Sequence, residues 1–157
     1  MNPEMAEAPA TPDPALADLL AERAIARQLI LFARAMDARD WAALDAIVAE
    51  EATGDYGEGP LAGRAAIVAT MRKYLDGCGP TQHLLGNLVI DLDGDRATSR
   101  CYVNDIHLGP GDKSALTFRT LGDYHDRWER RDGRWWMVER IKHNRGHVGT
   151  FEVFGLG

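Results

Sequence analysis

The sequence predicts an α+β domain in which three N-terminal helices pack on one face of a curved, mainly antiparallel sheet. Apolar residues recur at helical spacing over the first half of the chain, up to about residue 75. From residue 83 onward the pattern changes to that of long strands. Two turn sequences, Asp93-Gly94-Asp95 and Arg131-Asp132-Gly133, join these strands as β-hairpins. Helices followed by a meander of strands are typical of α+β proteins.

Length and composition favour a single globular domain. The 157 residues include 45% apolar and 27% charged side chains, which is ordinary for a chain that folds around a core. We expect one domain over residues 15–157. Residues 1–14, rich in alanine, proline and acidic side chains, are expected to form a flexible N-terminal arm.

Charge and hydropathy argue against several kinds of partner. The formal net charge of −6 disfavours binding to nucleic acid or to anionic membranes. No apolar run approaches the roughly 20 residues of a membrane span, and residues 1–4 lack the pattern of a signal peptide. Cys78 and Cys101 have no metal-binding or redox spacing. We therefore expect free thiols in a cytoplasmic protein.

Three helices are predicted before the strands begin. Asp13 is a suitable N-cap and Pro14 a suitable first-turn residue for the first helix. Asp40 is the expected N-cap of a second, shorter helix, and Gly63 leads into a third. The expected helices cover residues 14–36, 41–49 and 64–75.

Four long strands are predicted after the helices, and a short extended segment, residues 53–56, precedes the third helix. The expected long strands cover residues 83–92, 97–108, 114–129 and 134–142. Residues 143–157 are expected to form a tail that packs against the domain through its apolar side chains, namely Val148, Phe151, Val153 and Phe154.

Several segments resemble the SnoaL-like branch of the nuclear transport factor 2-like superfamily. They are residues 32–41 between the first two helices, 61–67 at the start of the third helix, 83–97 around the first hairpin and 119–136 in the closing strands. The resemblance covers roughly residues 18–145. It implies an α+β cone, a cone-shaped barrel in which the helices cover the curved sheet.

The resemblance also implies a catalytic pair. Scytalone dehydratases, bile-acid 7α-dehydratases and hexachlorocyclohexane dehydrochlorinases, which need no cofactor, use an Asp-His dyad inside the cone. Asp37 and His83 occupy the positions of that dyad, and Arg140 falls where the dehydrochlorinase type has an arginine. One position departs from the pattern, because the dehydrochlorinase and bile-acid types have Lys or Tyr five residues before the aspartate and this chain has Phe32. Phenylalanine has no proton to donate, so a general acid must come from elsewhere.

The chemistry of such a pair is general base catalysis. A neutral imidazole accepts a proton at one nitrogen while its other nitrogen donates to a carboxylate, which fixes the tautomer and stabilises the imidazolium. In an apolar cone, His83 would remove a proton from a carbon beside a carbonyl, and loss of a β-leaving group would complete an elimination. The alternative is that His83 only hydrogen-bonds at a helix–strand junction and that Asp37 only caps a helix.

Strand alternation adds three candidates. Asp105 and His107 are two residues apart on one predicted strand, so they face the same side. His107 is a candidate proton donor for a leaving hydroxyl, and Asp105 is a candidate ligand for a substrate hydroxyl. Asn104 replaces them if a bulge shifts the register. The alternative for this segment is an exposed strand end without a catalytic role.

Four further residues are candidates by position. Tyr56 ends the short extended segment and is a candidate proton donor, or else a core tyrosine. Arg140 is a candidate for pairing with an acid or stabilising an anionic intermediate, or else for a surface salt bridge. Trp41 and Phe32 are expected to pack in the core or to line the cavity that binds the substrate.

No metal or cofactor is expected from the sequence. His143 and His147 have the spacing of some zinc sites, but they lie outside any helical pattern, which such a site needs. Gly57, Gly59 and Gly63 lack the strand–turn–helix context of a dinucleotide-binding loop.

The sequence thus predicts a cofactor-independent lyase, a dehydratase that acts on a hydrophobic polycyclic, steroid-like or aromatic alcohol. One alternative is an isomerase or a polyketide-type cyclase that uses the same base. Another is a non-catalytic binding module or the small partner subunit of a ring-hydroxylating dioxygenase, although such a subunit has no need of the Asp37–His83 pair. Since the fold commonly assembles through its open sheet face and tail, we expect a homodimer or homotrimer.

Overall fold

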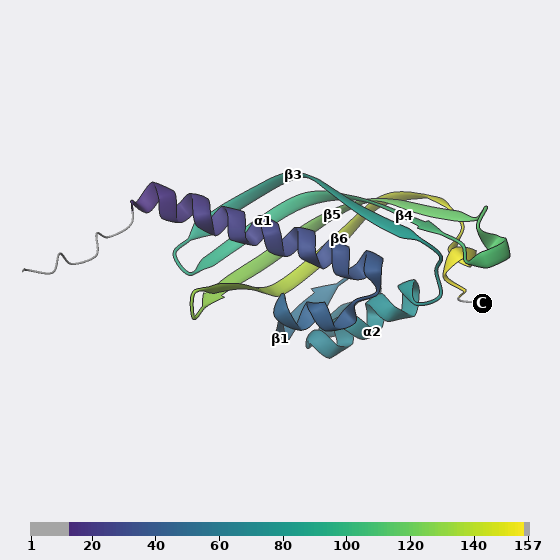
Figure 1. Cartoon of the computed structure of the whole chain (residues 1–157), viewed down its shortest axis with the longest axis horizontal. Helices are drawn as coiled ribbons and strands as arrows, with labels where there is room; N and C mark the ends of the chain where they lie inside the picture. The colour runs from purple at the N-terminus through teal and green to yellow at the C-terminus, as the bar shows by residue number, and fades with distance from the viewer. Residues whose placement is uncertain (1–12, 156–157) are drawn as a thin grey trace, which may run out of the picture.

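The structure, a computed structural model, describes residues 13–155, so most of the expected N-terminal arm lies outside the described residues (Figure 1). The helical segments before the main strands are α1 (Pro14–Ala38), the 3-10 helix η1 (Trp41–Ala46) and α2 (Arg64–Leu75). Two further 3-10 turns are η2 (Gly111–Lys113) and η3 (Phe151–Phe154). The strands are β1 (Val48–Asp55), β2 (Pro60–Ala62), β3 (Thr81–Asp93), β4 (Arg96–Leu108), β5 (Thr117–Arg131) and β6 (Arg134–Gly149).

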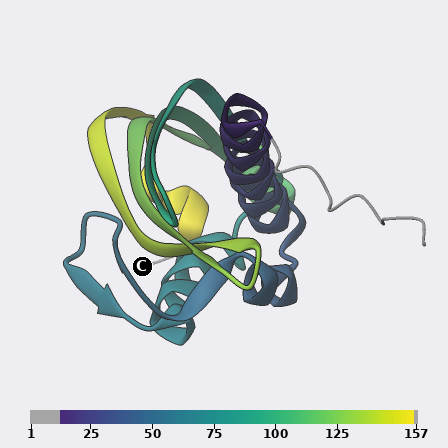
Figure 2. The same ribbon diagram turned by 90° about the vertical axis from the view of Figure 1, so that its left-hand side faces the viewer.

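The strands form one sheet in the order β2-β1-β6-β5-β4-β3. All neighbouring pairs are antiparallel except β1 and β6, which run parallel. Figure 2 shows the long strands curling around an interior, with α1 along one flank and α2 below. The predicted α+β cone with a curved, mainly antiparallel sheet is therefore confirmed.

The two long helices bury faces with regular helical spacing. The buried apolar side chains along α1 include Ile25, Leu29, Phe32 and Met36, and those of α2 are Ile67, Met71 and Leu75. Such a spacing places one stripe of each helix against the sheet, with α1 lying along β3 and α2 against β1. No helix in the described part of the chain is both long and apolar enough to cross a membrane.

Three sequence-based boundaries are corrected by the structure. The second predicted helix is a 3-10 helix that ends at Ala46, and Val48 already begins β1, because it pairs with Met137 of β6. The short strand β2, which begins at Pro60 and pairs with β1, was not among the predicted strands. The last strand continues to Gly149 instead of ending at Lys142, so half of the predicted tail belongs to the sheet.

A β-bulge in β6 explains why the end of this strand was difficult to predict. Leu121 pairs with Gly146 and Gly122 pairs with Asn144, which leaves Arg145 as an extra residue. As a result, Asn144 and His147, three residues apart, both face the interior. Simple alternation along the strand fails at this point.

The inner face of β4 changes from apolar to polar along its length. Alternate residues from Ala97 to Val103 are buried, and Asp105 and His107 continue the same face. Ala97 packs into the main core with Trp128, Trp135 and the helices, and Cys101 and Val103 pack with Tyr124 in a second cluster. The polar part begins where the packed core gives way to a cavity.

Candidate active site

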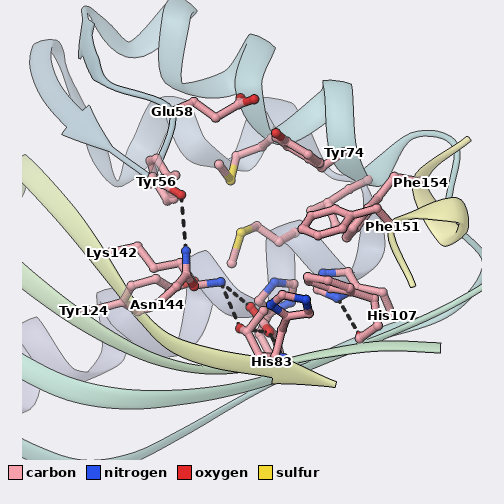
Figure 3. A pocket seen from close by; sticks show the side chains of 18 residues that line it. Tyr56, Glu58, Tyr74, His83, His107, Tyr124, Lys142, Asn144, Phe151 and Phe154 are labelled. Atoms are coloured by element: carbon pink, nitrogen blue, oxygen red, sulfur yellow. Dashed lines mark hydrogen bonds and ion pairs between the residues drawn. The ribbon is translucent and has the colours of Figure 1, made fainter. Parts of the chain in front are cut away.

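The interior of the cone contains a cavity of about 420 Å³ beside the main core, three residues of which line it, namely Met36, Met71 and Leu75 (Figure 3). Its walls come from the ends of α1 and α2, from the inner face of β3 to β6, from the segment after β1 and from η3. The lining residues are Met36, Tyr56, Gly57, Glu58, Met71, Tyr74, Leu75, His83, Asp105, His107, Phe118, Thr120, Tyr124, Lys142, Asn144, His147, Phe151 and Phe154. A mainly apolar lining with a few polar groups is typical of small-molecule sites.

The end of α1 is fixed to the start of β3 by one arginine. Arg39 follows the helix in a left-handed conformation, with φ of 57°. Its guanidinium donates to the carbonyl oxygens of Met36, Leu75 and Gly79 and to Oγ1 of Thr81. These bonds hold the last turn of α1, with Asp37, against the first residues of β3.

Asp37 and His83 form the predicted pair. Nδ1 of His83 lies 2.7 Å from Oδ1 of Asp37, and the backbone N–H of His83 donates to Oδ2 at 3.1 Å. Oγ1 of Thr81 donates to Oδ1 of Asp37 at 3.0 Å. The predicted hydrogen-bond contact is therefore present, and the carboxylate is held at three points.

These contacts assign the proton on the ring. Burial raises the pKa of Asp37, but the hydrogen bonds from His83 and Thr81 outweigh it, so the pKa lies below its ordinary value. An ionised carboxylate only accepts, so Nδ1 of His83 is the donor of this hydrogen bond, and in the neutral ring the lone pair lies on Nε2. The side chain is only 4% exposed and lines the cavity, so Nε2 is a base in an apolar space.

His107 is a second neutral imidazole beside the first. The two ring centroids are 5.5 Å apart and the planes are perpendicular. Nδ1 of His107 donates to the carbonyl of Phe118 at 3.2 Å, because a carbonyl only accepts. Burial lowers the pKa of His107 to about 4, more than its neighbour Asp105 raises it. Nε2 of His107 therefore has a lone pair and no proton at neutral pH, which contradicts the predicted role of proton donor.

Asp105 is held in a polar cluster on the cavity wall. Its Oδ2 accepts from Nζ of Lys142 at 2.5 Å, and its Oδ1 accepts from the backbone N–H of Thr120 at 3.1 Å and from Oγ1 of the same residue. Burial raises the pKa of Asp105, but the charge of Lys142 and these hydrogen bonds outweigh it. The carboxylate is ionised and already has partners on both oxygens, so its first role is to hold Lys142.

Tyr56 lines the cavity from the segment after β1. Its hydroxyl is the one buried side-chain polar atom among residues 13–155 that has no hydrogen-bond partner. Burial raises the pKa of Tyr56 to about 12, although the nearby Arg140 acts in the opposite direction. The phenol is therefore neutral at physiological pH, and its proton has no acceptor within the described part of the protein.

Arg140 lies in the core and does not line the cavity. The expected pairing with an acid is confirmed, whereas the expected contact with the substrate and the surface salt bridge are contradicted. Its guanidinium makes two bonds to Asp126, of 2.7 and 2.8 Å, and both side chains are fully buried. The guanidinium also lies 4.3 Å from the ring centroid of Phe32 and 3.9 Å from that of Tyr124. Phe32 thus packs against a buried cation beneath the cavity wall.

Two other predicted site residues lie away from the cavity. Asn104 faces outward and accepts a hydrogen bond from Arg119 at 2.7 Å, because β4 pairs with β5 without a bulge. Trp41 donates from its indole nitrogen to Asp76 at 3.0 Å and connects η1 to the end of α2. Neither side chain lines the cavity, so the expectation that they contact the substrate is wrong, whereas the alternative that Trp41 packs on the core is confirmed.

The cluster of His83, Asp105 and His107 also bears on metal binding. One potential ligand atom from each lies within 4.8 Å of the others. However, a cation there would compete with Nζ of Lys142 for the same carboxylate and would be repelled by its charge. The arrangement therefore fits proton chemistry better than metal binding. His143 and His147 lie apart, since His143 contacts His125 on the outer face and His147 lines the cavity.

Lys142 was missed in the sequence, although a signal for it exists. It follows Arg140 by two residues on one strand, so both face the interior. The aromatic residues of η3 that close one end of the cavity, Phe151 and Phe154, were expected only to pack. Figure 3 shows Lys142, His83 and His107 on the sheet side of the cavity, with Tyr56 and Tyr74 opposite them.

Comparisons with known proteins agree on the fold. The sequence profile described as a SnoaL-like domain matches residues 17–141. No curated protein matches the chain at a significant level. Among solved structures, a candidate scytalone dehydratase from Novosphingobium aromaticivorans is 22% identical, covers 87% of this chain and 91% of its own, and has a TM-score of 0.79.

Two further structures show how varied the similar proteins are. A type 2 hexachlorocyclohexane dehydrochlorinase is 19% identical over 87% of this chain and 93% of its own, with a TM-score of 0.77. A protein of unknown function from Mycobacterium tuberculosis is 20% identical over 84% of this chain and 76% of its own, with a TM-score of 0.74. At these identities the similarity establishes the fold and leaves the reaction to be argued from the site.

Proposed function

The chain belongs to the SnoaL-like domain family, and on that premise we propose that it is a cofactor-independent lyase, a dehydratase acting on a hydrophobic polycyclic or aromatic alcohol. The observation that carries the proposal is the contact between Nδ1 of His83 and Asp37 on the wall of a mainly apolar cavity, which leaves Nε2 of the ring to act on a bound molecule. The dehydratase and the dehydrochlorinase among the similar structures suggest elimination chemistry for this fold.

The proposed reaction begins with proton removal. Nε2 of His83 takes a proton from the carbon next to the hydroxyl-bearing carbon, and the anionic Asp37 stabilises the imidazolium that forms. Because Phe32 is a buried packing residue, the leaving hydroxyl needs another donor. The unpaired hydroxyl of Tyr56 supplies that proton, the carbon–oxygen bond breaks and water leaves. The imidazolium then returns the proton to the tyrosinate, so the site is restored.

The cavity supports a small apolar substrate. Its volume of about 420 Å³ lies in the lower part of the range for small-molecule sites, roughly 300–1,000 Å³. Aromatic side chains of Phe118, Phe151 and Phe154 surround one end, beside the two imidazoles. An isomerase is the second candidate, because the same base, Nε2 of His83, can return the proton to another carbon of the substrate when no group leaves.

A panel of aromatic and polycyclic alcohols, each with an acidic C–H beside the hydroxyl-bearing carbon, tests the proposal. Loss of water is followed by mass spectrometry, and thermal melting is measured for each variant. His83→Ala should abolish turnover with little change in melting temperature. His125→Ala is the matched control, because that imidazole is 43% exposed and lies on the outer face. Full turnover in a folded His83→Ala protein would exclude the mechanism, and a product of unchanged mass would favour the isomerase.

A further inference from the structure

Lys142 places a charged ammonium group on the wall of an otherwise mainly apolar cavity. Its side chain is 12% exposed, and its Nζ lies 2.5 Å from Oδ2 of Asp105 and 3.2 Å from Oγ1 of Thr120. It is the only lysine or arginine among the cavity-lining residues of the described chain. Arg140, two residues earlier, is sealed in the core with Asp126.

The hydrogen bonds of Lys142 leave one proton without an acceptor. An ammonium group has three N–H donors, and Asp105 and Thr120 accept two of them. The hydroxyl proton of Thr120 goes to Oδ1 of Asp105, so Oγ1 of Thr120 accepts from Lys142 through a lone pair. A buried ammonium group with an unsatisfied donor is destabilising. An oxygen of a bound molecule in the cavity can accept a hydrogen bond from this third donor.

The strand beneath Lys142 is shaped to let it reach this place. Gly122 of β5 has no side chain there, and a Cβ at that position would lie 2.9 Å from Cε of Lys142 and 2.7 Å from Cγ1 of Val103. The bulge opposite Gly122 also lies at this point of the sheet. The lysine stem thus crosses bare backbone on its way to Asp105, which fixes the position of Nζ beside the two imidazoles.

We propose that Lys142 binds the carbonyl oxygen of the substrate, so that the substrates are β-hydroxy carbonyl compounds with an apolar ring skeleton. This inference rests on the proposed lyase function of the same site. When His83 takes the proton from the carbon between the carbonyl and the carbinol, the electron pair moves to the carbonyl oxygen as an enolate. The Lys142 ammonium stabilises this charge where it develops. Collapse of the enolate expels the hydroxyl, which leaves as water with the proton from Tyr56, and the product is an unsaturated carbonyl compound.

The pairing with Asp105 argues for a donor and against a nucleophile. A Schiff base requires an amine nitrogen that is free to attack a carbonyl carbon, whereas Nζ of Lys142 is held as a hydrogen-bond donor to Asp105 and Thr120. The same pairing orients Nζ without placing a protein oxygen on its third proton. Lys142 therefore donates a hydrogen bond to the enolate oxygen. It takes the role of stabilising an anionic intermediate, which Arg140 cannot perform because it is buried in the core.

Binding of 2-naphthol tests this inference without turnover. Its ionised form carries negative charge on an oxygen of an apolar ring system, as an enolate does, and ionisation of the bound ligand is read from its absorbance spectrum. We expect the protein to bind the ionised form in preference, and Lys142→Met to lower that affinity by about 10- to 100-fold. Naphthalene, which has no oxygen, should bind equally well to both proteins. Lys142→Arg should retain most of the preference.

A double variant shows whether a loss of affinity in Lys142→Met comes only from destabilisation of the fold. Lys142→Met leaves the buried Asp105 without its counter-charge, so Lys142→Met/Asp105→Asn removes both charges together and should show the same loss. Equal affinity for the ionised ligand in the wild type and both variants would overturn the inference, even if His83-dependent elimination is found. Lys142-dependent binding without elimination of any alcohol would uphold this oxyanion site and refute the proposed lyase function.

Discussion

The imidazoles of His83 and His107 share one feature that decides their chemistry. In each ring, Nδ1 donates to an oxygen that only accepts, the carboxylate of Asp37 or the carbonyl of Phe118. The neutral form of each ring therefore has its lone pair on Nε2, but only His83 has a carboxylate on Nδ1 to stabilise its charged form. The same residue type thus gives a base at position 83 and a neutral hydrogen-bond acceptor at position 107.

The neutral state of His107 predicts how stability depends on pH. Its pKa is about 4 in the folded protein, against an ordinary value of 6.5. Between these values the unfolded chain binds a proton that the folded chain does not, so the free energy of unfolding falls as the pH falls from about 6.5 to about 4. The full loss is about 3 kcal/mol. Urea unfolding across this range measures it.

His107→Gln is the control for this titration. The glutamine variant should lose most of the pH dependence of unfolding between about pH 6.5 and 4, whatever its stability at pH 7. The pKa values of Asp37 and Asp105 lie below their ordinary value of 3.8, so these groups change the free energy of unfolding mainly at a pH below about 3.8, outside this window. An unchanged slope in His107→Gln would mean that another group titrates.

Removing the hydroxyl of Tyr56 should separate activity from stability. A buried hydroxyl without a partner destabilises the folded state by about 1–3 kcal/mol, so Tyr56→Phe should melt at the same or a higher temperature. If this hydroxyl is the proton donor, kcat should fall by about 10²–10⁴. Turnover and thermal melting of one protein preparation test both parts. A less stable variant with full activity would make the hydroxyl structural.

At the scale of secondary structure, β6 carries two cationic side chains on its inner face: Arg140 lies in the core and Lys142 lies on the cavity wall. Arg140 should contribute to folding and not to substrate binding. Arg140→Met leaves the fully buried Asp126 unpaired, and we expect a loss of about 3–5 kcal/mol in the free energy of unfolding. Arg140→Met/Asp126→Leu should recover much of it.

Kinetics distinguish this role from the one predicted from the sequence. The folded fraction of Arg140→Met should keep kcat/KM within about tenfold of the wild type, because the guanidinium does not line the cavity. A well-folded variant that loses turnover by several orders of magnitude would mean that Arg140 reaches the substrate.

The elements differ in how well the sequence predicts them. The bounds of α2 are recovered because Gly63 precedes it and Gly77 follows it closely. The end of β6 was predicted wrongly because the bulge at Arg145 breaks the alternation of inward and outward side chains. Val48 was predicted to be helical, but it joins a strand because it pairs with Met137, which is distant in the sequence. These features depend on tertiary partners that local patterns do not contain.

The same limit applies to the site. Asp37 and His83 were found through a resemblance that spans both elements, and their contact is confirmed. Alternation placed Asp105 with His107, and it would also have placed Lys142 with Arg140. Alternation predicts which face a side chain is on, but not whether it lies in the packed core or on the cavity wall. Arg140 is buried by Asp126 and Phe32 from other elements, whereas Gly122 leaves room for Lys142 to reach the cavity.

At the scale of the whole molecule, the outer face of the sheet predicts assembly. Large apolar side chains on four adjacent strands are exposed there, namely Leu84, Tyr102, Leu121 and Val148. Exposed apolar patches of this kind mark protein interfaces. We expect sedimentation to show a homodimer or homotrimer, and Leu121→Arg to dissociate it while the fold is kept. A wild-type monomer at micromolar concentration, or an unaffected oligomer in Leu121→Arg, would place the interface elsewhere or exclude it.

The central claim is that Asp37 and His83 act as one unit in proton transfer, and a double-mutant cycle on kcat/KM tests it most directly. Asp37→Asn keeps the shape of the carboxylate but removes its charge, so a loss of about 10²–10⁴ is expected. His83→Ala should abolish the base-dependent rate. The account predicts that the double variant is hardly slower than His83→Ala alone, because residues that act as a unit are not additive. Two independent losses that multiply in the double variant, with all proteins folded, would contradict it.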